Sequence, residues 1–152
     1  MQYRSPVDVH LLLTRADRIL LARRAGTGYA DGMWNLPSGK LDEGEDLQAA
    51  LIRESREELA LVLDPSTLTM ATTVHNLLPG TAARIGFFFH PRTWSGEPRN
   101  AEPHKCSEID WFPTTDLPEE LVAYSRAGIR QWSRGEAFGL LTSTDSTAPA
   151  HR

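Results

Sequence analysis

The segment that most constrains this chain is residues 39–61, GKLDEGEDLQAALIRESREELAL. It begins as a glycine-rich acidic loop and continues into a helix-forming run that carries Glu54, Glu57 and Glu58. Residues three and four apart lie on one face of a helix, so these carboxylates would project toward one patch. Like charges at such a short separation disfavour ionisation unless a cation lies among them. The segment therefore predicts a site for a hard divalent ion, Mg²⁺ or Mn²⁺.

The same segment has a plainer interpretation, an amphipathic helix with a solvated acidic face. Its other side is apolar and would dock on a sheet, through Leu47, Ala50, Leu51 and Ile52. Asp46 is placed to cap the start of the helix. Arg53 is the one cation beside the acids, and we expect an ion pair with Glu45 or a neighbouring carboxylate rather than a phosphate contact. Loop glycines, an isolated arginine and paired glutamates occur together at fixed spacing, which favours the metal site.

This spacing resembles the signature of the Nudix hydrolases, a loop–helix–loop that binds the metal of a diphosphate substrate. The pattern holds at Gly39, Glu45, Arg53, Glu54, Glu57, Glu58 and Leu61. It departs at Ser55, where an aliphatic residue is usual, and at Ala60, where glycine is usual. We expect the Ser55 hydroxyl to bond back to a carbonyl one turn earlier. Ala60 is strained if the helix needs a left-handed residue there; otherwise the helix runs on toward Asp64.

The length and composition fit one globular domain. A chain of 152 residues can bury a core, and 40% hydrophobic with 24% charged residues is average for soluble proteins. The resemblance covers residues 5–135 and implies the α/β Nudix fold, an α/β/α sandwich with a mixed curved sheet. We expect the Nudix domain over residues 1–139. From Thr142 onward the chain is polar, and we expect residues 140–152 to form a disordered tail.

Alternation and turn residues place the remaining elements. We expect a hairpin, then two central antiparallel strands of the sheet, then a short strand and a closing helix. The hairpin is expected over residues 6–14 and 18–24, and the two central strands over residues 68–78 and 82–91. The short strand is expected over residues 108–112, and the closing helix over residues 117–134. Pro118 suits the first turn of that helix. By the period of two in a strand, Phe87 and Phe89 lie on one face and Phe88 on the other.

The resemblance also implies roles for the acidic residues. The backbone carbonyl of Gly39 and the carboxylates of Glu57 and Glu58 would be the principal metal ligands. Glu54 would be a further ligand or the general base. Many family members place another glutamate in the loop before the short strand, and Glu102 is the preferred candidate for this second base, ahead of Glu108. The alternative for Glu102 is a solvated loop acid.

A further group of side chains is predicted to line a substrate pocket. It consists of Arg23, Tyr29, Trp34, His75, Arg84, Phe87 and Tyr124. Several of them have a structural alternative. Arg23 could be a solvated strand end, His75 a sheet histidine, and Phe87 a core residue, since aromatic side chains fill cores more often than they line pockets. These residue types are typical of any pocket and point to no single ligand.

The resemblance implies a metal-dependent pyrophosphohydrolase that cleaves a nucleoside diphosphate linked to another moiety. Small size and the lack of an added domain favour the MutT-like branch, which converts a nucleoside triphosphate to the monophosphate and pyrophosphate, over nucleoside-diphosphate-sugar hydrolases. A non-catalytic nucleotide or metabolite sensor is the alternative, but a pure binder would not need every carboxylate of the signature. An RNA-cap hydrolase would need a basic channel, which a net charge of −4 does not offer.

The same totals bear on partners and location. The sequence has no basic tract, so we expect a small nucleotide as partner, with no duplex nucleic acid and no membrane. It could be a monomer or a homodimer. No apolar run approaches a membrane span, and the N-terminus has no secretory pattern, so a cytoplasmic location is expected. The single cysteine, Cys106, agrees with a reducing compartment and is not expected to act as a nucleophile.

Overall fold

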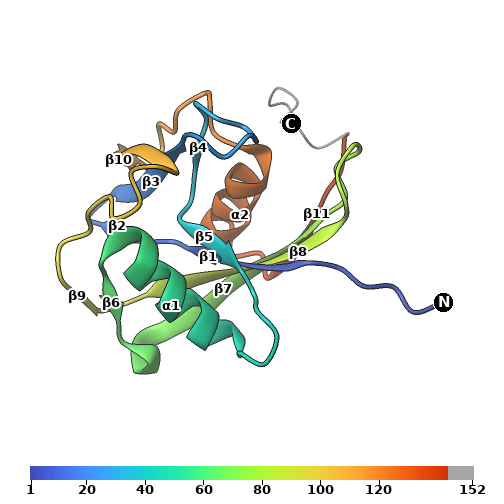
Figure 1. Ribbon diagram of the computed structural model, residues 1–152, viewed down its shortest axis with the longest axis horizontal. Coiled ribbons are helices and arrows are strands. Elements are labelled where there is room, and N and C mark those ends of the chain that lie inside the picture. Colours follow the sequence, from blue (N-terminus) through green and yellow to red (C-terminus); the bar gives the residue numbers. More distant parts are fainter. Residues whose placement is uncertain (144–152) are drawn as a thin grey trace.

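The computed structural model describes residues 1–143, and two helices lie on opposite sides of its central strands (Figure 1). In chain order the elements are β1 Val7–Leu11, β2 Thr14–Arg15, β3 Arg18–Arg24, β4 Trp34–Asn35, β5 Ser38–Lys40, α1 Leu47–Leu59, β6 Val62–Leu63, the 3₁₀ turn η1 Pro65–Thr67, β7 Leu68–Asn76, β8 Arg84–Pro91, β9 Trp94–Ser95, β10 Cys106–Pro113, α2 Ala123–Ser133 and β11 Phe138–Leu141. No helix of this described part is both long enough and apolar enough to cross a membrane.

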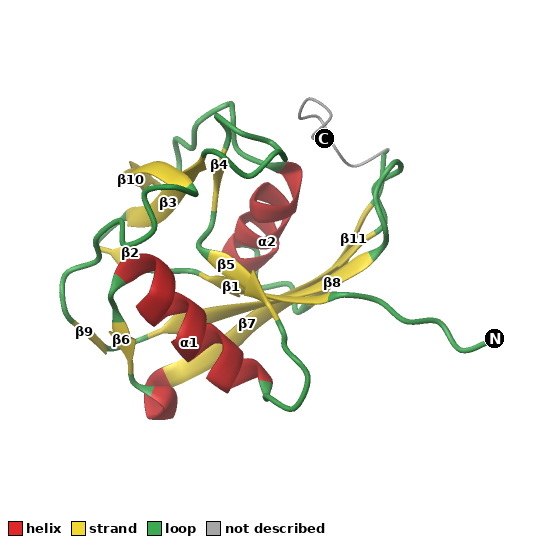
Figure 2. Cartoon of the chain, viewed as in Figure 1, coloured by secondary structure: helices red, strands yellow, loops and turns green. Residues whose placement is uncertain are grey.

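The main sheet is mixed, and its strand order is β11-β7-β8-β1-β5 (Figure 2). Strands β1 and β8 run parallel, as do β11 and β7, while β7–β8 and β1–β5 are antiparallel. A second sheet has the order β10-β3-β2, with β4 pairing to β3, and β6 pairs with β9. The predicted antiparallel pair at the centre of a mixed sheet is therefore confirmed.

The alternation of strand β8 divides the core between the two helices. Phe88 is fully buried in a cluster with Ile129 of α2. Phe89 is buried, and Phe87 packs, in a second cluster that includes Leu51 of α1. Successive side chains of a strand point to opposite faces, so one strand supplies both layers. The predicted α/β/α sandwich and the predicted division of the three phenylalanines are confirmed.

Helix α1 begins and ends as its terminal residues require. The Asp46 carboxylate accepts a hydrogen bond from the Ala49 N–H at 2.8 Å, so this residue caps the helix as predicted. The helix ends at Leu59 because Ala60 adopts a left-handed conformation with φ of 54°. An alanine there costs about 1 kcal/mol relative to glycine. Of the two outcomes considered for Ala60, the structure has the strained one.

The prediction for Ser55 was wrong. This residue is 2% exposed, and its hydroxyl makes no hydrogen bond to any described part of the chain. A helical carbonyl that accepts one N–H can still accept a hydroxyl, but Ser55 makes no such bond within the described residues, and burial excludes water as a substitute partner. The position is packed as an aliphatic site would be, with an unsatisfied hydroxyl in it.

Three predicted boundaries need correction. The run at residues 6–14 divides: β1 joins the main sheet, and only β2 forms the hairpin with β3. The closing helix begins at Ala123 rather than residue 117, because the preceding backbone bonds to Trp34, which donates to the Glu120 carbonyl at 2.7 Å and accepts from Val122 N–H at 2.9 Å. Strand β11 carries the sheet through Leu141, beyond the predicted boundary at residue 140. Residues 144–152 of the predicted tail lie outside the described residues.

Candidate active site

A cavity of about 1090 Å³ gathers most of the predicted site residues. Those that line it are Arg23, Tyr29, Gly39, Glu54, Glu57, Glu58, Arg84, Glu102 and Tyr124. They come from strands of both sheets, from both helices and from the loop before β10. The fold therefore brings together segments that are far apart in the sequence.

One part of the cavity, which we call the acidic end, is formed by Glu54, Glu57, Glu58 and Glu102. The first three project from α1, and Glu102 comes from a loop in which its carbonyl accepts the N–H groups of Lys105 and Cys106 at 2.9 and 3.1 Å. Gly39 of β5 lies directly against Glu54, because a Cβ atom at position 39 would clash with that side chain. A glycine is required there, and its backbone can approach the carboxylates closely.

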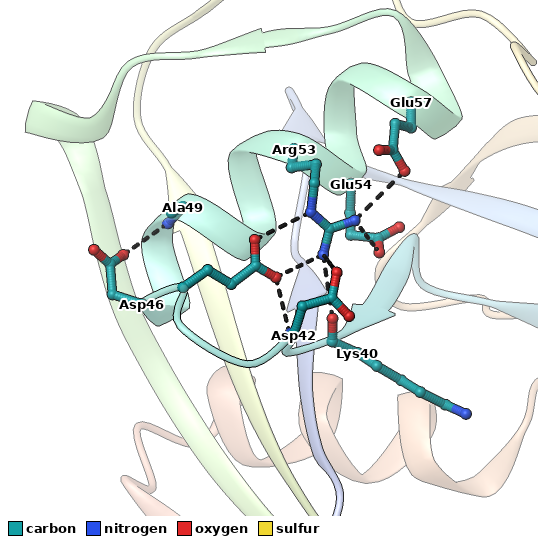
Figure 3. A network of polar contacts seen from close by, with 8 residues as sticks. Lys40, Asp42, Asp46, Ala49, Arg53, Glu54 and Glu57 are labelled. Carbon is teal, nitrogen blue, oxygen red and sulfur yellow. Dashed lines mark hydrogen bonds and ion pairs between the residues drawn. The ribbon is translucent and has the colours of Figure 1, made fainter.

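Arg53 organises the loop and helix beside the acidic end (Figure 3). Its guanidinium binds both carboxylate oxygens of Glu45, at 2.6 and 3.1 Å, and Oε1 of Glu54 at 2.9 Å. Weaker contacts reach Glu57 at 3.5 Å and Asp42 at 3.3 Å. The hydrogen bond from Arg53 lowers the pKa of Glu45, and the bond to Glu45 raises the pKa of Arg53. The predicted ion pair is confirmed, and most of the donors of Arg53 already have protein acceptors.

The carboxylates that Arg53 does not neutralise carry unbalanced charge. Burial, followed by repulsion from Glu54 and Glu102, raises the pKa of Glu58 to about 8, although Lys105 acts in the opposite direction. Burial also raises the pKa of Glu54, against the effect of Arg53. A cation would relieve this repulsion, and an all-oxygen donor set suits Mg²⁺ or Mn²⁺.

The fit to a metal is therefore chemical rather than geometric. In residues 1–143, no three His, Cys, Asp or Glu side chains are grouped as a coordination sphere. The donors that could hold the ion are the Gly39 carbonyl and the carboxylates of Glu54, Glu57 and Glu58, which share the acidic end. Their assignment as ligands stays a prediction.

Another wall of the cavity holds a buried polar cluster that the sequence interpretation largely missed. Asp8 is 6% exposed and accepts two hydrogen bonds from Arg84, at 2.6 and 2.8 Å, and one from the Tyr124 hydroxyl at 2.9 Å. This pairing raises the pKa of Arg84, whereas burial raises the pKa of Tyr124. Arg84 and Tyr124 were predicted pocket residues. Asp8 and its neighbour His10 were not.

His10 lies beside this cluster as a neutral imidazole. Its ring stacks on Phe88 with a centroid separation of 4.1 Å and meets Tyr124 edge-on at 4.7 Å. Neither ring nitrogen has a hydrogen-bond partner in the described part of the chain, and burial lowers its pKa to about 4. A signal was present in the sequence, since Asp8 and His10 alternate with apolar residues in a buried strand and must therefore share one face.

The glycine-rich loop after β3 forms a further border. Arg24 donates to the Tyr29 carbonyl at 2.7 Å and lies over its ring at 5.3 Å. Arg23 donates to the Gly32 carbonyl at 2.9 Å and lies 3.6 Å from Glu108. Glu108 is thus turned toward Arg23 and does not line the cavity, in contrast to Glu102.

Three predicted pocket residues lie elsewhere. Trp34 is 6% exposed and packs edge-on against Phe112 in the core on the α2 side. Phe87 packs in the cluster on the α1 side. Neither these two nor His75 line the cavity. Trp34 and Phe87 therefore belong to the core clusters, and we assign substrate contact to none of the three.

Comparison with known proteins places this geometry in a family. The NUDIX domain model matches residues 4–132. The 8-oxo-dGDP phosphatase NUDT18 of Homo sapiens is 30% identical over 120 residues, which cover 78% of this chain but only 35% of that protein. The RNA pyrophosphohydrolase of Novosphingobium aromaticivorans is 26% identical over 86% of this chain and 90% of that protein.

A solved structure agrees with these relatives. The MutT NUDIX hydrolase from Burkholderia pseudomallei superposes with a TM-score of 0.77 and 30% identity, over 85% of this chain and 98% of that one. Its match covers far more of the chain than the signature segment alone. The chain belongs to the Nudix hydrolase family, as the spacing within residues 39–61 predicted.

Proposed function

We propose that this protein is a metal-dependent pyrophosphohydrolase that converts nucleoside triphosphates to monophosphates and pyrophosphate. The observation that carries the proposal is the acidic end, where four carboxylates face one cavity and Arg53 neutralises only part of their charge. Burial first, and then repulsion from Glu54 and Glu102, raises the pKa of Glu58. A site of this kind favours a divalent cation and the phosphate chain that the cation carries.

The site residues divide into those that would bind the metal ion and those that would accept a proton. The Gly39 carbonyl, Glu57 and Glu58 would hold the ion, and Glu54 would be a further ligand or the base. When bound, Mg²⁺ or Mn²⁺ neutralises the phosphate oxygens and makes the attacking water more acidic. Glu54 or Glu102 accepts the proton of that water. Lys105 lines the cavity beside Glu58 and would contact phosphate oxygens.

The relatives suggest which triphosphates to test. Relatives named as an 8-oxo-dGDP phosphatase and an RNA pyrophosphohydrolase make oxidised guanine nucleotides and 5′-triphosphate RNA candidate substrates. The net charge of −4 favours small nucleotides over RNA. Nucleoside-diphosphate sugars and non-catalytic sensing remain the alternatives. A cytoplasmic location and a monomer or homodimer are the expected context.

The test is a hydrolysis panel with Mg²⁺ or Mn²⁺. It contains nucleoside triphosphates with oxidised forms, nucleoside-diphosphate sugars, dinucleoside polyphosphates and 5′-triphosphate RNA. We expect Glu57→Gln and Glu58→Gln each to reduce kcat/KM by at least about a hundredfold, because even residues that only orient metal ligands reach that size of effect. Products are separated by chromatography to identify the bond that breaks.

Glu43→Gln is the matched control, since Glu43 is exposed in the same acidic loop and does not line the cavity. It should retain full activity. Folded protein that binds metal but turns over none of the panel would contradict hydrolysis and favour the sensor. Turnover that survives both glutamate substitutions would contradict the roles given to the acidic end.

A further inference from the structure

One wall of the cavity is built from three adjacent strands and presents hydrogen-bond donors. We call Asp8 of β1, Arg84 of β8 and Asn76 of β7 the donor wall; all three line the cavity. Asn76 and Arg84 are directly opposite each other in the β7–β8 pair, so their side chains lie on the same face. Asp8 joins them through its two hydrogen bonds to Arg84.

The donors and the acceptors of the wall differ in how far the protein already uses them. Both oxygens of Asp8 are occupied by Arg84 and Tyr124. The Oδ1 atom of Asn76 accepts from the Leu78 N–H at 3.0 Å. Within residues 1–143, the Nη1 group of Arg84 and the Nδ2 group of Asn76 have no such partner. The wall therefore offers N–H donors without a protein partner in the described chain, while each of its side-chain oxygens already accepts at least one hydrogen bond.

The donor wall lies close to the acidic end. Strand β1 pairs with β5 in a register that places Asp8 opposite Lys40 and Val9 opposite Gly39. Cα atoms paired in this way are about 5 Å apart. Gly39 in turn contacts Glu54. A ligand whose phosphates lie at the acidic end can therefore reach the wall with the group at its other end.

The charge of the wall decides which acceptor it fits. Arg84 is neutralised by Asp8, so the pair as a whole carries no net charge, whereas a phosphate is held best by an unpaired cation. A neutral carbonyl oxygen needs only donors. Adenine has no carbonyl group, while hypoxanthine and guanine carry one at position 6.

We propose that the donor wall is the specificity-determining part of the cavity and selects a nucleobase that carries a carbonyl oxygen. Arg84 and Asn76 donate hydrogen bonds to that oxygen, and Asp8 is a positioning residue that fixes the guanidinium. This inference rests on the proposed function only in taking the substrate to be a nucleotide. The purines inosine and adenosine differ at position 6 and form the cleanest pair for the test.

The experiment compares ITP, GTP and ATP as substrates, and IMP and AMP as ligands in calorimetry. We expect ITP and GTP to exceed ATP in kcat/KM by about tenfold or more. This is the size of discrimination between bases that well-placed side-chain hydrogen bonds to a base edge give. In Asp8→Asn/Arg84→Met this preference should disappear through a higher KM for ITP, with ATP hydrolysis little changed. The double variant removes the guanidinium without leaving a buried carboxylate unpaired.

A second variant and a matched control accompany it. Asn76→Asp keeps the oxygen that accepts from Leu78 and removes the amide donors, so it should reduce the same preference even if the double variant does not fold. Arg15→Met/Glu97→Gln makes the same charge changes at an exposed two-bond ion pair that does not line the cavity. It should retain the wild-type preference.

Two outcomes with an active enzyme overturn the inference. Equal use of ITP and ATP by the wild type would show that the wall does not select the base. An equal loss on both substrates in Asp8→Asn/Arg84→Met would place phosphate oxygens at Arg84 instead. If no triphosphate is hydrolysed, the proposed function fails alone when IMP still binds more tightly than AMP, and both fail when it does not.

Discussion

Arg53 and Arg84 each hold a carboxylate with two hydrogen bonds, and they differ in where their partners come from. The acidic partners of Arg53 all lie within the signature segment, at most eleven residues away, at Asp42. Arg84 binds Asp8, which is 76 residues away along the chain, and Tyr124 binds the same carboxylate from 116 residues away. One network is local and the other is made by tertiary structure.

The two networks also differ in their surroundings. The Arg53 side chain is 31% exposed and touches four carboxylates, two of them more than half exposed. The Asp8 side chain is 9% exposed and has a single cationic partner. Water and salt screen the first network, while burial preserves the second and makes the loss of either partner costly. The spacing of residues along the sequence thus identifies the solvent-screened network around Arg53. The network of Arg84 and Asp8 owes its strength to burial.

The largest effect is expected when the buried pair is broken. Asp8→Asn leaves the Arg84 guanidinium without a counter-charge and should lower the free energy of unfolding by about 4 kcal/mol. The loss should change little between about 0.05 M and about 1 M NaCl, because buried pairs are poorly screened. Urea unfolding at both salt concentrations measures it.

Arg53→Met provides the contrast in the same measurement. Its destabilisation should be smaller than that of Asp8→Asn and should shrink at high salt, because Arg53 is partly exposed and two of its four partners are more than half exposed. Similar salt dependence for the two variants would remove the distinction between a screened and an unscreened network.

A second effect concerns pH and the buried side of the cavity. Burial lowers the pKa of His10 to about 4 from its ordinary 6.5, so the unfolded chain takes up a proton first as the pH falls. The contribution is complete above about pH 6.5 and is lost as the pH falls toward about 4, a total of about 3 kcal/mol. Asp8 opposes this shift and Arg84 reinforces it.

Comparing the wild type with His10→Leu at several pH values checks this expectation. Leucine cannot titrate, so the variant should lose less stability than the wild type between about pH 7 and about pH 4. Parallel curves of stability against pH for the two proteins would show that folding does not lower the pKa of His10.

The smallest effect concerns the end of the helix that carries the acidic residues. Ala60→Gly should raise the free energy of unfolding by up to about 1 kcal/mol, because glycine adopts the left-handed conformation at φ of 54° without strain. Ala49→Gly in the exposed first turn of the same helix is the control and should destabilise by up to about 1 kcal/mol. Thermal unfolding of both distinguishes them, and destabilisation by Ala60→Gly would contradict the strain.

Local patterns predicted the acidic end well. The cap at Asp46, the pair between Arg53 and Glu45, and the shared placement of Glu54, Glu57 and Glu58 all follow from offsets along one loop and helix. Predictions for single residues failed where tertiary packing decides the environment of the side chain. Trp34 looked like a pocket residue and is core, while the buried Ser55 hydroxyl has no protein partner in the described chain.

The sequence by itself determined the acidic helix, because its cap, ion pair and carboxylate face depend on contacts a few residues apart. The spacing of the same segment identified the family, and the layered fold was what that resemblance implied. Only the tertiary structure decided that Asp8, Asn76 and Arg84 form one wall. Their meeting depends on the order and register of strands β1, β8 and β7, which no spacing along the chain records. The physical reason is that a strand pattern identifies the face of a side chain but leaves open which neighbouring strand completes it.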